Sequence, residues 1–161
     1  MRIELLDAEN NVLSMVDTTD PDAELEFYGP QLGAVAWREY QAPAPTAEEI
    51  RAAALARIDA ATRAAIVGGF VSSASGSPHT YDSDENDQKN LTLMQTVSHS
   101  PRFAAHPVYQ GRIPIRAVPE GETEKTKLYL TTEQMDLLVE DLALHIGACK
   151  MAGWAAQAEV Q

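Results

Sequence analysis

The sequence predicts an α+β protein: a small β-rich N-terminal unit, then a capped helix, β-hairpins, a short helix and a long C-terminal helix. Alternating apolar and polar residues, separated by turn-forming residues, fill the first part of the chain and are typical of short strands. Apolar residues recur at helical spacing after residue 46 and again after residue 131. Pro43 and Pro45 lie between the two kinds of pattern and favour an extended connection. We therefore predict a β-rich unit in residues 1–41, a linker in residues 42–46 and a compact α+β body in residues 47–161.

The charge is concentrated in the N-terminal unit. The chain of 161 residues has a formal net charge of −12, and its first 45 residues contain nine acidic but only two basic side chains. Such a surface repels phosphate groups, so we expect neither nucleic acid nor a membrane as a partner. The sequence has no signal-peptide pattern at its start and no apolar run of spanning length, which predicts synthesis and folding in the cytoplasm of the producing cell.

The N-terminal unit is expected to contain a hairpin and one further extended segment. Residues 2–6 and 12–16 alternate on either side of Asn10 and Asn11, which tolerate the left-handed backbone of a tight turn. Residues 34–40 form the third extended segment. A unit of this size buries few aromatic side chains on its own. We therefore expect its four aromatic residues to contact another protein: Phe27, Tyr28, Trp37 and Tyr40.

The body is expected to begin with a capped helix. Thr46 and Glu49 have the spacing of a capping box, and Gly68 and Gly69 supply a helix end. Residues 70–73 and 79–81 then form strands around a Ser-Gly-Ser-Pro turn.

A shorter helix and a second hairpin complete the middle of the body. Asp82 or Ser83 caps the helix, which has acidic residues in its first turn. Residues 98–111 have no clear period and are expected to form a loop. Residues 112–118 and 125–130 alternate around a Pro-Glu-Gly-Glu turn and predict a hairpin.

The C-terminal helix has the clearest pattern. Thr131 and Gln134 form a second capping box, and a regular stripe of residues follows. The stripe consists of Met135, Leu138, Leu142, His145, Cys149, Ala152 and Ala156. We expect Gly147 and Gly153, which are unfavourable in a helix interior, to mark close helix contacts. This face could pack within the chain or form a bundle with sister copies.

Two patterns contain residues that could bind a metal ion. Asp82, Asp84 and Asn86 match the start of a calcium-binding loop, but its later positions hold Asp87 and Leu93 in place of glycine and glutamate. The acids are better explained as helix-capping residues.

Asp141, His145 and Cys149 lie four residues apart and could present oxygen, nitrogen and sulfur atoms to zinc. No fourth ligand is visible near them, and His145 and Cys149 belong to the apolar stripe, so a hydrogen-bonded core histidine is the preferred interpretation. We expect no metal and no other cofactor.

The sequence also offers no constellation for catalysis. Its serines lack the Gly-x-Ser-x-Gly motif, and the single cysteine lacks the context of a catalytic thiol. No segment combines a nucleophile, a base and an oxyanion site. We therefore expect a protein that is not an enzyme.

Residues 46–161 carry motifs that resemble a known family. These are the alanine-rich helix ending before Gly68, Gly69 and Phe70, the Tyr-Asp-Ser-Asp-Glu segment at 81–85, and the Leu-Tyr-Leu-Thr-Thr-Glu-Gln segment at 128–134. The combination resembles a domain of unknown function that is common in bacteriophage and prophage tail proteins, usually encoded close to tail-fibre genes. The family has no established catalytic residues that could be transferred to this sequence.

The resemblance implies a non-enzymatic, tail-associated or tail-fibre-associated structural protein, made in the host cytoplasm and located in the virion tail. Residues 1–41 would then form an attachment unit for other tail or tail-fibre proteins, and a homo-oligomer is a further option. One alternative is a tail-fibre assembly chaperone. An alternative from another class is a metal-dependent hydrolase that uses Asp141, His145 and Cys149.

Overall fold

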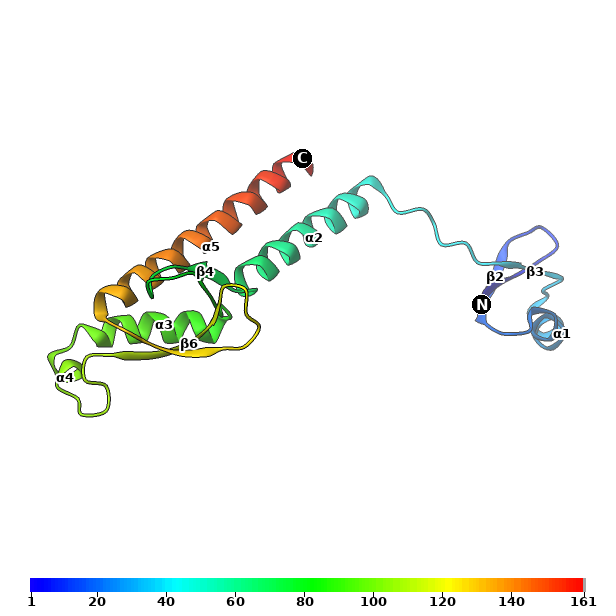
Figure 1. Cartoon of the computed structure of the whole chain (residues 1–161). Helices are drawn as coiled ribbons and strands as arrows, with labels where there is room; N and C mark the ends of the chain where they lie inside the picture. The colour runs from blue at the N-terminus through cyan, green and yellow to red at the C-terminus, as the bar shows by residue number, and fades with distance from the viewer. Residues whose placement is uncertain (161) are drawn as a thin grey trace. The chain divides into compact units, whose positions relative to one another are not determined.

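The computed structural model describes residues 1–160, and the chain divides into two compact units (Figure 1). The first unit is Met1–Thr46, and the second begins at Ala47. Both units combine helices with antiparallel strands, so the predicted α+β class is confirmed. None of the helices described within residues 1–160 has the length and apolar character that crossing a membrane requires.

The N-terminal unit is a three-stranded antiparallel sheet with one helix. Its strands are β1 (Arg2–Leu6), β2 (Val12–Asp17) and β3 (Ala36–Glu39), in the order β2-β1-β3. The predicted hairpin and third strand are confirmed. Asn10 adopts a φ of +68° in the hairpin turn, where the Asp7 carboxylate accepts hydrogen bonds from the backbone amides of Glu9 and Asn11.

Helix α1 (Pro21–Leu32) adds an element that the predicted β-rich unit, with its hairpin and third extended segment, does not include. The Asp20 carboxylate caps the helix by accepting from the Ala23 amide, and Pro21 occupies the first turn, which suits proline. Gly33 ends the helix with a φ of +75°. Gly29 is buried, and a Cβ at this position would lie 2.9 Å from the Ala34 carbonyl oxygen, so the close packing here requires glycine.

This helix gives the N-terminal unit a small core of its own. Ile3 and Leu5 on the central strand are fully buried together with Ala34. Four partly buried side chains pack against them: Val16, Leu25, Tyr28 and Trp37. Two of the four aromatic residues expected at a protein contact therefore also help to hold the unit together.

The body contains four helices and four strands among the residues described. In chain order they are α2 (Ala47–Val67), β4 (Phe70–Ser72), β5 (His79–Tyr81), α3 (Glu85–Ser98), α4 (Pro101–Ala104), β6 (Ile113–Pro119), β7 (Thr126–Leu130) and α5 (Thr132–Val160). The strands form one antiparallel sheet in the order β4-β5-β6-β7. The predicted helices and hairpins are confirmed, but the expected loop at residues 98–111 contains the short helix α4.

The unequal lengths of β5 and β6 leave part of one strand edge unpaired. Strand β5 pairs with β6 only through His79 with Pro119 and Thr80 with Val118. Within the described part of the chain, residues 113–117 of β6 therefore pair with β7 alone. The chain leaves β5 for α3 at this point, so the unpaired edge faces a helix instead of a strand.

Two helix N-termini show how side chains fix the body. At α5, the Thr131 amide donates to the Gln134 side chain at 2.9 Å and the Gln134 amide donates to the Thr131 hydroxyl at 3.2 Å, which confirms the predicted capping box. At α3 the cap is Asp84, which accepts from the amides of the second and third helical residues. This corrects the predicted cap at Asp82 or Ser83.

Ser83 has a different role at the end of α2. Its buried hydroxyl donates to the Ile66 carbonyl oxygen at 2.6 Å and accepts from the Gly69 amide at 2.9 Å. The residue thereby satisfies backbone groups that the end of α2 leaves without helical partners.

The main core lies where α5 and α3 meet the sheet. Eleven residues form it: Phe70, Ala74, Tyr81, Leu91, Phe103, Ile113, Ala117, Leu130, Met135, Leu138 and Leu142. The second half of α5 packs against α2 (Figure 1). Gly153 is buried in that contact, where an added Cβ would lie 2.3 Å from the Thr62 hydroxyl oxygen.

The predicted stripe on α5 needs two corrections. Ala152 is exposed, and the neighbouring Gly153 takes its place in the packed face. Gly147 was expected at a close helix contact, yet the position of its missing Cβ has nothing within 4 Å. An α-helix has 3.6 residues per turn, whereas alternating steps of three and four residues average 3.5. A stripe with that spacing therefore rotates gradually away from the packed face over several turns.

Candidate functional site

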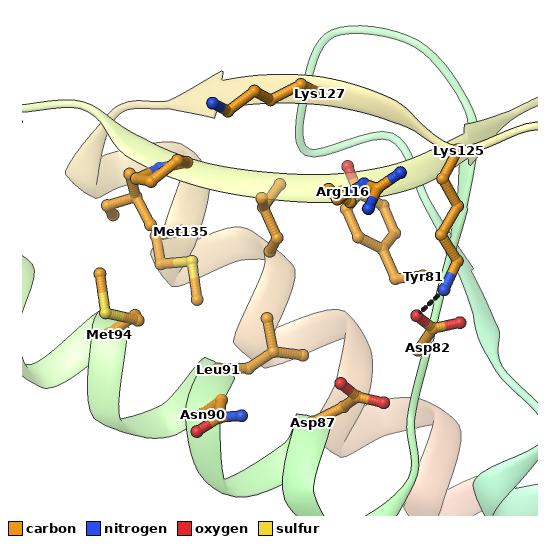
Figure 2. A pocket seen from close by; sticks show the side chains of 13 residues that line it. Tyr81, Asp82, Asp87, Asn90, Leu91, Met94, Arg116, Lys125, Lys127 and Met135 are labelled. Atoms are coloured by element: carbon orange, nitrogen blue, oxygen red, sulfur yellow. Dashed lines mark hydrogen bonds and ion pairs between the residues drawn. The ribbon is translucent and has the colours of Figure 1, made fainter.

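A cavity of about 580 Å³ opens between α3 and the β6–β7 hairpin, next to the unpaired edge of β6 (Figure 2). Tyr81, Asp82, Asp87, Asn90, Leu91, Met94, Ile113, Pro114, Ile115, Arg116, Lys125, Lys127 and Met135 line it. The volume lies in the range typical of ligand sites. Its position follows from the short β5, which leaves space that a longer strand would fill.

The inner part of the cavity is apolar. Leu91 and Met94 lie one turn apart on the face of α3 that is directed toward the hairpin, as Figure 2 shows. Ile113 of β6 and Met135 of α5 are almost fully buried and complete the apolar lining. This part of the cavity offers van der Waals contact to an apolar group.

The rim of the cavity carries charges of both signs. The Lys125 ammonium group forms an ion pair with the Asp82 carboxylate (Figure 2). Arg116 and Lys127 are cross-strand neighbours on β6 and β7 and add two further cations. Burial, with smaller contributions from the charges of Asp84 and Asp82, raises the pKa of Asp87.

The arrangement is suited to recognition. A ligand with an apolar group could bury that group against Leu91 and Met94 while a negative charge contacts Arg116 or Lys127. Asn90 offers both a donor and an acceptor to a polar ligand group. Well-placed polar groups at the rim of an apolar pocket fix the orientation of what binds there.

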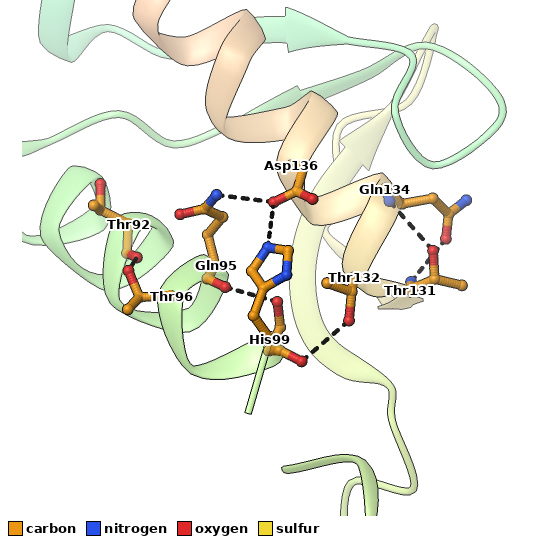
Figure 3. Close-up of polar contacts among 9 residues, drawn as sticks. Thr92, Gln95, Thr96, His99, Thr131, Thr132, Gln134 and Asp136 are labelled. Carbon is orange, nitrogen blue, oxygen red and sulfur yellow. Dashed lines mark hydrogen bonds and ion pairs between the residues drawn. The ribbon is translucent and has the colours of Figure 1, made fainter. Parts of the chain in front are cut away.

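A polar network joins the last turn of α3 to the first turn of α5 (Figure 3). The Asp136 carboxylate accepts hydrogen bonds from His99 Nε2 at 2.9 Å and from the Gln95 side chain at 2.8 Å. The Thr132 hydroxyl donates to the Ser98 carbonyl oxygen at 3.2 Å. The hydrogen bond from His99, and then that from Gln95, lowers the pKa of Asp136. The network therefore stabilises the contact between two helices.

Asp141 and His145, two of the three weak metal candidates, have hydrogen-bond partners in other segments of the chain. The Asp141 carboxylate accepts a hydrogen bond from the Ser72 hydroxyl at 2.5 Å. His145 Nε2 donates to the Ala65 carbonyl oxygen of α2 at 3.1 Å and lies 3.8 Å from the sulfur of Cys149. Among residues 1–160, no three His, Cys, Asp or Glu side chains could hold a metal ion together. This corrects the suggested ligand set and places His145 in a helix contact.

The four aromatic residues of the N-terminal unit occupy different environments. Phe27 is 63% exposed on α1 and contacts Tyr28 edge to face, with 4.8 Å between the ring centroids. Tyr28 and Trp37 are half-buried in the unit's core, and the Trp37 indole donates to the Asp22 carboxylate at 2.8 Å. Tyr40 is also half-buried and follows β3. Of the four, Phe27 offers the largest exposed apolar surface.

The sequence of the body identifies its family. A family model described as "Domain of unknown function (DUF4376)" matches residues 49–161. The chain belongs to the DUF4376 family. Neither the curated proteins nor the solved structures that were compared gave a match. The DUF4376 match falls within the body, and the N-terminal unit lies outside it.

The residues around the DUF4376 cavity were not found from the sequence. The sequence predicts Asp82 as a helix cap, Asp87 as one of the acids in the first turn of that helix, and Arg116 and Lys125 as members of a hairpin. Asp82 and Lys125 are 43 positions apart in the sequence, and only the antiparallel return of the hairpin brings them into contact. The only feature of the sequence that points to the cavity is the shortness of the predicted strand at residues 79–81.

Proposed function

We propose that this DUF4376 protein is a non-enzymatic structural component of a bacteriophage tail or tail fibre, with the N-terminal unit as its attachment surface. The observation that carries the proposal is a separate compact unit, Met1–Thr46, that presents the exposed aromatic ring of Phe27. The resemblance of residues 46–161 to proteins of phage tails supplies the setting. In this proposal the protein is made in the host cytoplasm and ends in the virion tail.

The surroundings of Phe27 favour a protein partner. Exposed aromatic side chains often supply the buried anchors of protein interfaces. The ring is supported from one side by Tyr28, which is fixed in the small core, so little freedom is lost when a partner covers it. Asp22, Glu24 and Glu26 lie on the same helix. A partner with a basic rim around an apolar pocket would complement this surface.

A pair of matched substitutions tests the attachment surface. Phe27→Ala removes the exposed ring, whereas Met15→Ala removes a side chain of comparable exposure on β2. We expect Phe27→Ala to lower the amount of the protein in purified tail particles at least about tenfold, which corresponds to about 1.4 kcal/mol. We expect Met15→Ala particles to retain the wild-type amount. Equal amounts for all three proteins would contradict the proposal.

The amount of protein in mature particles separates a structural component from an assembly chaperone. A structural component is present in a fixed number of copies per particle, and an assembly chaperone is bound to fibres before assembly and absent afterwards. We expect a fixed copy number in finished tails. A protein found only on unassembled fibres would favour the chaperone, and one found in neither fraction would overturn the tail assignment.

A further inference from the structure

Helix α5 has a second apolar face, opposite the face that packs within the body. Four large side chains on it are more than half exposed: Leu137 (53%), Leu144 (65%), Met151 (68%) and Trp154 (64%). The inward face of the same helix carries Leu138, Leu142 and Gly153, all of which are buried. An apolar line of this length on a helix surface is a feature of interaction sites.

The spacing of these residues is that of a coiled coil. Leu137, Leu144 and Met151 are seven residues apart and occupy one position of a heptad. Three residues after each of these lies the second position of the heptad. It is occupied in turn by Glu140, Gly147 and Trp154. Two helices that share such a pattern can pack along it with alternating side chains.

We propose that this outward face of α5 binds the same face of a second copy of the chain, with the two α5 helices antiparallel. A face that is complementary to itself is what a two-fold dimer requires, because each residue then forms its contact twice. The proposal goes beyond the attachment function and does not depend on it, since it uses only residues of the body.

Charge selects the antiparallel direction. Glu140 lies within the apolar line, and Lys150 is exposed beside it ten residues later. A parallel dimer would place the two Glu140 carboxylates opposite each other, which is unfavourable at a contact between helices. An antiparallel dimer centred between residues 145 and 146 places Glu140 of each chain beside Lys150 of the other.

Side-chain size agrees with the same register. Gly147 then lies opposite Leu144 of the second copy, and the space around the missing Cβ of Gly147 is open for at least 4 Å. Leu137 lies opposite Trp154 at both ends of the contact. At the centre of the contact, Leu144 of each copy thus faces Gly147 of the other, which allows the backbones of the two α5 helices to approach each other.

Charge exchange on the full-length chain tests the proposal. We expect light scattering to show a dimer for the wild type, and Glu140→Lys or Lys150→Glu alone to raise its dissociation constant at least about tenfold. The dissociation constant of the double variant Glu140→Lys/Lys150→Glu should lie within about threefold of the wild-type value, because opposite charges again face each other across the antiparallel contact. Glu48→Lys, an exposed change of the same kind on α2, serves as the control and should have no effect. Circular dichroism confirms that each variant is folded.

A distance measurement tests the direction independently. A spin label at Ala158, in a Cys149→Ser background, should lie about 38 Å from its counterpart in the antiparallel dimer, from a helical rise of about 1.5 Å per residue. A parallel dimer would bring the labels within about 10 Å along the adjacent helices. A wild-type chain that remains monomeric at high concentration, a double variant that stays monomeric, or a short label distance would each overturn the proposal.

Discussion

The two units of the chain hold themselves together in different ways. The body buries eleven core residues contributed by seven of its strands and helices and the loop after β4, and α5 alone supplies Met135, Leu138 and Leu142. The core cluster of the N-terminal unit contains Ile3, Leu5 and Ala34 and is completed by half-buried side chains, among them Tyr28 and Trp37. In the smaller unit, the residues that stabilise the fold therefore overlap with those that we propose contact a partner. In the body, the packed face and the proposed contact face lie on opposite sides of α5.

The largest expected effects come from substitutions in the core of either unit, and each should be confined to the unit that carries the substitution. Leu138→Ala should destabilise the body by about 2–5 kcal/mol, because Leu138 is fully buried and its loss leaves a cavity. Leu5→Ala should remove most of the hydrogen-exchange protection of β1–β3 and leave that of α5 unchanged. Amide exchange followed by mass spectrometry measures both. Loss of protection in α5 after Leu5→Ala would show that the units share one core.

A smaller effect is expected where α2 meets α5. Gly153→Ala should destabilise the body by about 1–3 kcal/mol, because the new methyl group would overlap the Thr62 side chain. Thr62→Ala should relieve most of that loss in the double variant. Gly147→Ala, on the open side of the helix, should instead stabilise the folded chain by up to about 1 kcal/mol through helix propensity.

Thermal unfolding at a dilution that keeps the chain monomeric compares these variants. A Gly153→Ala protein as stable as the wild type would mean that the helices are not closely packed at this point.

The smallest expected effect concerns the polar network between α3 and α5. Asp136→Asn should lower stability at neutral pH by no more than about 1 kcal/mol, because the carboxylate is partly exposed and screened by solvent. The pKa of Asp136 is lowered from 3.8, so the stabilisation is complete above that pH and is lost as the pH falls through the lowered value. The difference between wild type and variant should therefore shrink in acid, which unfolding curves at several pH values can measure. A difference that grows in acid would contradict the assigned hydrogen bonds.

Most elements of the body could be predicted because their signals are local. The capping box of Thr131 and Gln134, the glycines after α2 and the alternating hairpin residues act over a few positions, and each is confirmed. Helix α1 was missed because Gly29 and Pro30 lie inside it, and both residues usually interrupt a helix. The close approach of Ala34 to Gly29 explains the glycine, and that contact is visible only in the folded chain.

The candidate sites depended on contacts that the sequence does not display. The spacing of Asp141, His145 and Cys149 suggested ligands on one helix, but their partners Ser72 and Ala65 come from distant segments. The cavity likewise joins α3 to a hairpin that returns more than 20 residues later. By contrast, the seven-residue spacing of the exposed face of α5 is present in the sequence, and exposure was needed to separate it from the packed face.

The most direct test of the attachment function is photo-crosslinking from position 27 in assembled tails. A photoreactive amino acid in place of Phe27 should yield one discrete adduct with another tail protein, because the side chain is exposed on the N-terminal unit. The same amino acid at Met15, on β2, serves as the reference position and should give little or none of that adduct. Absence of any adduct from position 27, or the same adduct at equal yield from both positions, would contradict the proposed role of the N-terminal unit.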